Sequence, residues 1–341
     1  MSKMRAIFLT KYGSAKDAFE IKEITLPALG KEEVEIKVHC SGLNFADVVA
    51  RRGIYPDAPK NPAVLGYDVA GMITALGSDV RGFAVGDRVV ALTRFGGYAS
   101  HVHAASYGVA KIPATIDFGE ATVLATQGCT AYHCAVECTT IHPGDKVLIH
   151  AAAGGVGSIL VQLAKRKGAV IFGTASASKL ENLKARGVDF PIDYTSLDFK
   201  KEILKLTEGI DIVFDSVGGT SFKKGMQLLR PGGTMVSYGA AEQMKSIKNK
   251  LSLVPMLLGF GIYSPLMLLM KSQSIVTVNM LRIADCKPNN FNLMLNEVVA
   301  LAANGSLKPL VSKVFDYQDI ASAHDYLESR ASIGKVVIKW I

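Results

Sequence analysis

The chain has 341 residues, of which 49% are hydrophobic, so it is long enough for two domains with a large apolar core. Its formal net charge is +8, but the lysines are scattered and no basic helix alternates with stacking aromatic residues, which argues against a nucleic-acid partner. A solvated basic surface that attracts phosphate-bearing ligands explains the charge better. Residues 1–9 lack a long apolar run, and the five cysteines have no framework spacing, so we expect a cytoplasmic protein.

The first 125 residues are predicted to be rich in β-strands. Residues 34–38 alternate apolar and polar side chains, which is the period-two pattern of a half-buried strand. Glycines recur over residues 66–86 and separate short apolar runs, as is typical of a small barrel-like fold. Asp117 and Glu120 have the spacing of a capping box and predict the start of a helix.

The strongest motif lies in residues 144–165 and predicts a dinucleotide site. Residues 146–150 read as a short buried strand, and apolar residues at helical spacing follow the glycines. The pattern is A-x-x-G-x-x-G, at Ala151, Gly154 and Gly157, and not the strict G-x-G-x-x-G. A strand, a glycine turn and a helix N-terminus together offer backbone N–H groups and a partial positive charge to a pyrophosphate.

Each small residue of this motif has a predicted task. Gly154 lets the chain turn tightly out of the strand, whereas Gly155 and Val156 bring the backbone close to phosphate. Gly157 lets the helix pack against the strand. A bare glycine run could also be an ordinary loop, but the legible strand and helix on either side favour a nucleotide site.

After this motif, strands and helices alternate. Strands are predicted at residues 169–173, 211–218, 233–239 and 274–280, and one of the helices between them covers residues 179–186. Such alternation predicts a parallel, doubly wound sheet. The residues from 291 onward read as helix, strand, helix and strand.

These motifs resemble a known family. Residues 152–157, together with Asp145, Leu148, Gln162 and Lys165, are similar to the signature of the zinc-free, zeta-crystallin-like quinone oxidoreductases, a branch of the medium-chain dehydrogenase/reductase family. Residues 42–56, 64–71, 172–179, 191–194, 230–233 and 333–338 match the same family, so the resemblance covers nearly the whole chain. The segments FGTASASK and PIDY resemble the vesicle-amine-transport-protein subgroup in particular.

The resemblance implies an α/β protein with a chaperonin-10-like β-barrel catalytic domain and a Rossmann domain with a doubly wound parallel sheet. In this family the C-terminal tail returns to the first domain. We therefore expect the catalytic domain at residues 1–125 and 296–341 and the NADP-binding Rossmann domain at residues 126–295. The family also implies a homodimer.

The end of the second strand in the nucleotide domain favours NADPH over NADH. Folds that select NAD usually place an Asp or Glu there, about 20 residues beyond the glycines. Here Thr174, Ser176, Ser178 and Lys179 follow instead, and Glu181 is the first carboxylate. Hydroxyl and ammonium groups attract a 2′-phosphate that an acid would repel. Ser178 and Lys179 could, however, simply begin the next helix.

The resemblance extends the cofactor site to further residues. It implies that Lys179, Tyr194 and Arg330 contact the phosphate end of the adenosine. It also implies that Asn44, Thr130 and the stretch around Met280 lie toward the nicotinamide. The other expected cofactor residues are Gly154, Gly155, Val156, Thr174, Ser176, Ser216, Gly239 and Ala240.

We expect no metal. Related alcohol dehydrogenases hold a catalytic zinc with Cys, His and Cys, and matching the motifs places Asn44, Tyr67 and Thr126 at those positions. None of these side chains is a good zinc ligand. The cysteine-rich lobe of a structural zinc is also missing, and small buried thiols explain the cysteines of residues 129–138 better than a metal site does.

Without zinc, nothing stabilises an alkoxide, so the accessible reaction is hydride delivery from NADPH to a quinone or an α,β-unsaturated carbonyl. Asn44 could donate a hydrogen bond to the carbonyl oxygen, and Tyr55 and Tyr67 could hydrogen-bond or stack on a flat substrate. These three are the candidate catalytic residues, although each could instead be a core residue with a satisfied polar tip. The alternative function is a non-catalytic NADPH-binding protein that acts through an apolar surface.

Residues 251–270 form an uncharged apolar stretch between two lysines. Its length would suffice to span a bilayer. However, Pro255 and Pro265 interrupt it, and it lies between two strands of one predicted sheet. We therefore expect a lid or a subunit contact without integral membrane insertion, and peripheral membrane contact stays open.

Overall fold

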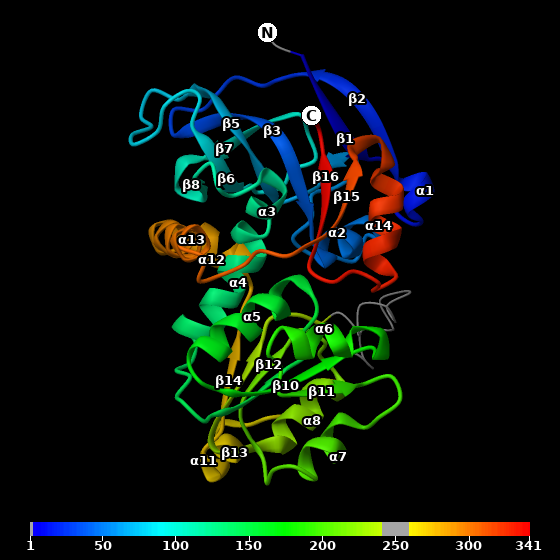
Figure 1. Cartoon of the computed structure of the whole chain (residues 1–341). Coiled ribbons are helices and arrows are strands. Elements are labelled where there is room, and N and C mark those ends of the chain that lie inside the picture. The colour runs from blue at the N-terminus through cyan, green and yellow to red at the C-terminus, as the bar shows by residue number, and fades with distance from the viewer. Residues whose placement is uncertain (1–2, 241–258) are drawn as a thin grey trace. The chain divides into compact units, whose positions relative to one another are not determined.

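The computed structural model describes residues 3–240 and 259–341, which form two compact units (Figure 1). Unit 1 comprises residues 1–129 and 280–341, and unit 2 comprises residues 130–279. Unit 1 is therefore built from two segments that are separate in the sequence.

Unit 1 is rich in β-strands and contains two sheets. The smaller sheet has the strand order β2-β1-β4, and the larger runs β15-β16-β3-β5-β6-β8, with β7 also paired to β3. The strands are β1 Lys3–Leu9, β2 Phe19–Thr25, β3 Glu33–Leu43, β4 Ala63–Val64, β5 Asp68–Leu76, β6 Arg88–Leu92, β7 His101–Ala105, β8 Val109–Lys111, β15 Val311–Asp316 and β16 Lys335–Lys339. The alternation predicted for residues 34–38 is confirmed, because Val34, Ile36 and Val38 are fully buried in β3.

One apolar core joins the two sheets of unit 1, since Ile7 and Leu9 of β1 belong to the same core as Ile36 and Val38 of β3. The capping box predicted at Asp117 is confirmed, because its carboxylate accepts the Gly119 backbone N–H at 2.7 Å. The helices are α1 Ala15–Ala18, α2 Phe45–Arg51, α3 Phe118–Ala121, α12 Met280–Cys286, α13 Pro288–Ala303 and α14 Ile320–Glu328, while α4 Cys129–Tyr132 spans the boundary with unit 2.

Unit 2 contains a sheet with the strand order β11-β10-β9-β12-β13-β14, in which every pairing is parallel. Its strands are β9 Lys146–Ile149, β10 Val170–Ala175, β11 Phe190–Asp193, β12 Ile210–Asp215, β13 Leu229–Ser237 and β14 Ser274–Thr277. Its helices include α5 Gly155–Arg166, α6 Leu180–Ala185, α7 Phe199–Leu204, α8 Thr220–Leu228 and α11 Pro265–Lys271. The chain starts at β9 and proceeds outward in both directions, which is the doubly wound topology predicted from the sequence.

Residues 280–295 group with unit 1, although the sequence analysis assigned them to the nucleotide domain. Helix α13 packs against β8 and the turn before it. Its Phe291 is fully buried, and the Asn292 side chain donates to the carbonyl oxygen of Tyr107 at 2.9 Å. The strand predicted for residues 274–280 is also shorter, since β14 ends at Thr277 and Met280 begins α12.

Only part of the predicted apolar stretch is described, because residues 251–258 lie outside the described residues. Within residues 3–240 and 259–341, no helix is long and apolar enough to cross a membrane. The stretch ends in α11, a helix of 7 residues. Leu268 of α11 packs against the core of unit 2, whereas Leu266, Leu269 and Met270 are 64%, 74% and 80% exposed.

Candidate active site

One edge of the unit 2 sheet carries most of the predicted cofactor residues. Since the strands are parallel, their carboxyl ends lie at the same edge, where doubly wound folds bind their ligands. This edge brings together residues 151–157 after β9, residues 176–179 after β10, Tyr194 after β11, Ser216 after β12 and residues 239–240 after β13.

The turn after β9 requires small residues. A Cβ atom on Gly157 would lie 2.3 Å from the carbonyl oxygen of Ala151, so only glycine allows α5 to pack this closely on the turn. Gly154 is the N-cap of α5 and contributes no side chain to the cap. The backbone N–H groups of Gly155 and Val156 at the start of α5 are therefore oriented as a phosphate site requires.

Ala151 stands at the first glycine position of the motif and has a left-handed backbone φ of 50°. This conformation costs a non-glycine residue about 1–2 kcal/mol. The hydroxyl of Thr174 supports it, because this oxygen accepts the Ala151 N–H at 3.3 Å and lies 3.0 Å from Nδ1 of His150. Thr174 is 2% exposed, so we propose that this buried side chain stabilises the turn at Ala151.

Asp193 anchors the loop where we expect the adenosine phosphate. It ends β11 in register with Ala175 of β10. Its carboxylate accepts hydrogen bonds from the hydroxyls of Thr195 and Ser196, each at 2.6 Å. These bonds, with a weaker one from the Ala177 backbone, hold the pKa of Asp193 below its usual range. The carboxylate is thus engaged within the protein, mainly by the turn that follows β11.

The loop itself gathers polar groups. The hydroxyls of Ser176 and Ser178 lie 3.4 Å apart, and Lys179 ends the same 3₁₀ turn. The Tyr194 backbone N–H donates to the carbonyl oxygen of Ala175 at 3.2 Å, so Tyr194, which is 41% exposed, lies beside the end of β10 that leads into this loop. Two hydroxyls, a lysine and a phenol therefore share one end of the sheet edge.

The other end of the edge brings Ser216 and residues 239–240 together. A Cβ atom on Gly239 would lie 2.8 Å from the Ser216 carbonyl oxygen, and one on Gly218 would lie 3.2 Å from the Ala240 Cα. Thr130, another predicted cofactor residue, is buried at the start of unit 2.

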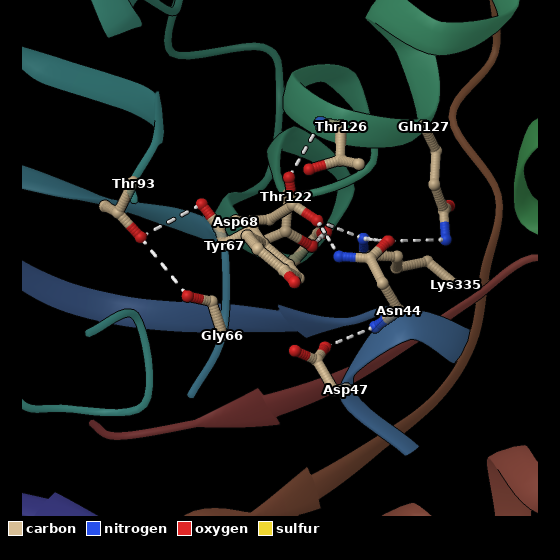
Figure 2. A network of polar contacts seen from close by, with 11 residues as sticks. Asn44, Asp47, Gly66, Tyr67, Asp68, Thr93, Thr122, Thr126, Gln127 and Lys335 are labelled. Carbon is tan, nitrogen blue, oxygen red and sulfur yellow. Dashed lines mark hydrogen bonds and ion pairs between the residues drawn. The ribbon is translucent and has the colours of Figure 1, made fainter. Parts of the chain in front are cut away.

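In unit 1, polar side chains gather around Asp68 (Figure 2). Asp68 and Lys335 are both fully buried and form an ion pair. Asn44 donates from Nδ2 to Asp68 at 2.7 Å, and its Oδ1 accepts from the Lys335 Nζ at 2.9 Å. Its Oδ1 also accepts from the Gln127 Nε2 at 3.4 Å, while the Thr126 backbone N–H donates to Asp68 at 2.7 Å.

The three positions matched to zinc ligands therefore lie around Asp68. Asn44 and Thr126 bind its carboxylate, and Tyr67 precedes it in the chain. In the part of the chain that the structure describes, no group of three or more His, Cys, Asp and Glu residues could hold a metal ion. The buried cation that contacts Asp68 here is the ammonium group of Lys335.

Two tyrosines lie beside this cluster. Tyr67 is 3% exposed, and its ring packs on that of Phe95 with the centroids 5.0 Å apart. Burial raises the pKa of Tyr67, and the nearby Asp47 and Tyr55 raise this pKa further. Burial also raises the pKa of Tyr55. Both phenols thus remain neutral and can donate hydrogen bonds.

Asp47 is a second carboxylate that contacts Asn44, besides Asp68. It is fully buried in α2 and accepts the Asn44 backbone N–H at 2.8 Å. Burial raises the pKa of Asp47 to about 7, although the bond from Asn44 and the nearby Tyr98 and Lys335 oppose this effect. Asp47 therefore changes charge near neutral pH.

Comparison with known proteins decides the family. The family described as alcohol dehydrogenase GroES-like domain matches residues 30–146, and the one described as zinc-binding dehydrogenase matches residues 186–338. The synaptic vesicle membrane protein VAT-1 homolog of Mus musculus is 34% identical over 338 residues, which cover 98% of this chain and 83% of that protein. The chain belongs to the medium-chain dehydrogenase/reductase family.

Solved structures of this family have the same fold. The Escherichia coli quinone oxidoreductase, determined as a complex with NADPH, has a TM-score of 0.85 and 28% identity, with 99% of this chain and 100% of that chain covered. The CurK enoyl reductase has a TM-score of 0.85 and 30% identity, with 98% of this chain and 99% of that chain covered. The predicted GroES-like and Rossmann domains are thus confirmed, and the protein is an oxidoreductase of this family related to quinone oxidoreductases and enoyl reductases.

The remaining predicted residues fall within unit 1. Tyr55 is half-buried, Met280 is buried at the start of α12, and Arg330 follows α14 with a left-handed backbone φ of 61°. The predicted residues are thus divided between the two units.

Sequence reasoning missed Asp47, Asp68, Gln127 and Lys335. A signal was present for two of them, because Asp68 and Lys335 interrupt the apolar segments VLGYDVAG and IGKVVI. A charge inside an apolar strand requires a buried partner. The sequence did not indicate that these two residues are each other's partners, since 267 positions separate them.

Proposed function

We propose that this medium-chain reductase is a zinc-independent, NADPH-dependent enzyme that delivers hydride to quinones or α,β-unsaturated carbonyls. The observation that carries this proposal is the Lys335–Asp68–Asn44 cluster. Of the positions matched to zinc ligands, Asn44 already accepts a hydrogen bond from the Lys335 ammonium group, and Thr126 donates its backbone N–H to Asp68, which is paired with the same ammonium group. A metal ion would have to displace a fully buried cation to bind there.

The unit 2 sheet edge supports the NADPH part of the proposal. The small residues at the start of α5 leave room for a pyrophosphate, and the loop at residues 176–179 presents hydroxyl and ammonium groups to a 2′-phosphate. When bound, NADPH supplies the hydride. The chain itself binds and orients the nicotinamide and excludes water.

The unit 1 residues support the acceptor part of the proposal. A quinone or enone gains negative charge on its carbonyl oxygen as it accepts hydride, and neutral hydrogen-bond donors stabilise that charge. Tyr55 and Tyr67 remain neutral donors, and the Asn44 amide has one N–H left after its bond to Asp68. We propose these three groups as the polar contacts of the acceptor.

Stopped-flow mixing tests the reductase directly. The protein with bound NADPH is mixed with naphthoquinone, phenanthrenequinone or a 2-alkenal, and the loss of NADPH absorbance is recorded with and without a chelator. We expect oxidation that the chelator leaves unchanged. Tight NADPH binding without oxidation by any acceptor would instead favour a non-catalytic NADPH-binding protein that acts through contacts of its exposed apolar residues, such as those of α11.

The second prediction concerns cofactor choice. The protein should bind NADPH more tightly than NADH, and Lys179→Glu should abolish or reverse this preference, because a carboxylate would repel the 2′-phosphate. We expect a loss of at least ~2 kcal/mol, or about 30-fold in the Kd for NADPH. Fluorescence titration with both cofactors measures it. Lys201→Glu, an exposed charge reversal on α7, is the matched control and should leave both affinities within ~2-fold. Equal affinities of the unaltered protein for the two cofactors would refute the assignment.

We also propose a cytoplasmic homodimer. All five cysteines are free thiols, which suits a reducing compartment. The exposed apolar side chains Leu266, Leu269 and Met270 are the surface that we propose for a subunit contact, because apolar groups gathered on one helix favour burial against a partner.

A further inference from the structure

Lys335 and Asp68 allow the Asn44 amide only one orientation. An ammonium group has only donors, and a carboxylate has only acceptors. They contact opposite ends of the amide, with Oδ1 2.9 Å from the Lys335 Nζ and Nδ2 2.7 Å from the Asp68 Oδ2 (Figure 2). Rotation of the amide by half a turn would place N–H groups against the ammonium and oxygen against the carboxylate.

The position of Lys335 is itself fixed. Its side chain is fully buried, and its Cε lies 2.3 Å from where a Cβ atom on Gly42 would be, so the stem passes directly over the glycine of β3. Asp68 is held as well, because its Oδ1 accepts the Thr126 backbone N–H at 2.7 Å and its Oδ2 accepts from the Lys335 ammonium group.

We propose that Lys335 is a positioning residue for hydride transfer and acts through Asn44; this proposal rests on the proposed reductase function. Lys335 and Asp68 together engage Oδ1 and one N–H of Asn44. The second N–H of the amide is thereby held as a donor in a fixed direction, toward the acceptor oxygen on which negative charge develops. Lys335 is fully buried and needs no contact with the substrate for this role.

The first arm of the test observes the amide without any turnover. In protein labelled with ¹⁵N-asparagine, the side-chain NH₂ signals of Asn44 are those that disappear in Asn44→Ala. They should exchange slowly with solvent in the unaltered protein and at least ~10-fold faster in Lys335→Met. Lys313→Met is the matched control, because Lys313 is an exposed lysine on the neighbouring strand β15, and it should leave the signals unchanged.

The second arm is a double-mutant cycle on the turnover rate. Lys335→Met should lower kcat by about 10- to 100-fold and leave the Kd for NADPH within ~2-fold. In the Asn44→Ala background, the same change should lower kcat by no more than ~2-fold further, because the residue through which it acts is absent. If Lys335→Met does not fold, Lys335→Met with Asp68→Asn replaces it, since removal of both charges leaves no unpaired carboxylate in the core.

The outcomes separate the two proposals. Unchanged Asn44 exchange in the Lys335 variant, or kcat losses that add in the double variant, would overturn the positioning role. Absence of turnover by the unaltered protein with every acceptor would refute the reductase function alone, and the exchange measurement would then decide the role of Lys335 by itself.

Discussion

Gly157→Ala should destabilise unit 2 by about 3 kcal/mol and lower NADPH affinity by more than ~10-fold. Alanine normally favours a helix over glycine by about 1 kcal/mol, so the expected sign is opposite to the helix propensity. The reason is that the added Cβ would lie 2.3 Å from the Ala151 carbonyl oxygen and 2.8 Å from the Ala152 Cα. Backbone atoms cannot rotate away, so α5 must move off the turn and carry its N–H groups with it.

Urea denaturation and NADPH titration measure these two effects, and Gly225→Ala provides the matched control. Gly225 also lies in a helix, but its added Cβ would meet the terminal methyl group of Met235, at 2.6 Å, which can move. This variant should cost less than about 1 kcal/mol and retain its NADPH affinity. If Gly157→Ala were as stable as Gly225→Ala, the close packing of α5 on the turn would be contradicted.

Asp47→Asn should stabilise the protein progressively as the pH rises from about 4 to about 8. The pKa of Asp47 is about 7 in the folded chain against an ordinary value of 3.8. Below the lower value, both states are protonated and the contribution of Asp47 to stability is fully present. Between the two values, only the unfolded chain releases the proton, so stability falls as the pH rises through the folded pKa. The difference between these two pKa values corresponds to a loss of at most about 4 kcal/mol in the free energy of unfolding.

Asparagine removes this titration and keeps an oxygen that can accept the Asn44 N–H, so the difference from the unaltered protein should grow with pH. Unfolding by urea at about pH 5 and about pH 8 measures the difference. Asp87→Asn is the control, because a hydrogen bond from Lys111 lowers the pKa of Asp87, and its effect should be the same at both pH values. A pH-independent difference for Asp47→Asn would show that Asp47 keeps one charge state throughout.

The unit 2 sheet could be predicted because the sequence patterns that indicate it lie in short, continuous segments. Residues 146–150, the glycine turn and α5 follow one another, and each has its own pattern of apolar and small residues. The left-handed conformation of Ala151 could not be predicted, because alanine rarely adopts it and the support comes from Thr174 on the next strand.

The unit 1 cluster could be predicted only in part, for the same reason. The resemblance placed Asn44, Tyr67 and Thr126 together, yet periodicity carries no information about which charges pair across distant strands. The hydrogen bonds of Asp193 could not be predicted either, since its partners are hydroxyl groups of a kind that is common in any loop. Residues 280–295 group with unit 1 and not with the predicted nucleotide domain, because the apolar face of α13 does not reveal from the sequence which core covers it.

The place of β16 between β3 and β15 has a consequence for how the protein is made. Unit 2 is one continuous segment and can fold on the ribosome as soon as its residues have emerged. Residues 40–43 of β3 must wait for their partner strand, because β16 is synthesised much later. At roughly 5–20 residues per second, the 267 positions from Asp68 to Lys335 take on the order of 15–50 s. During that time the nascent chain exposes an open strand edge and a carboxylate without its counter-ion, which is the kind of surface that chaperones bind.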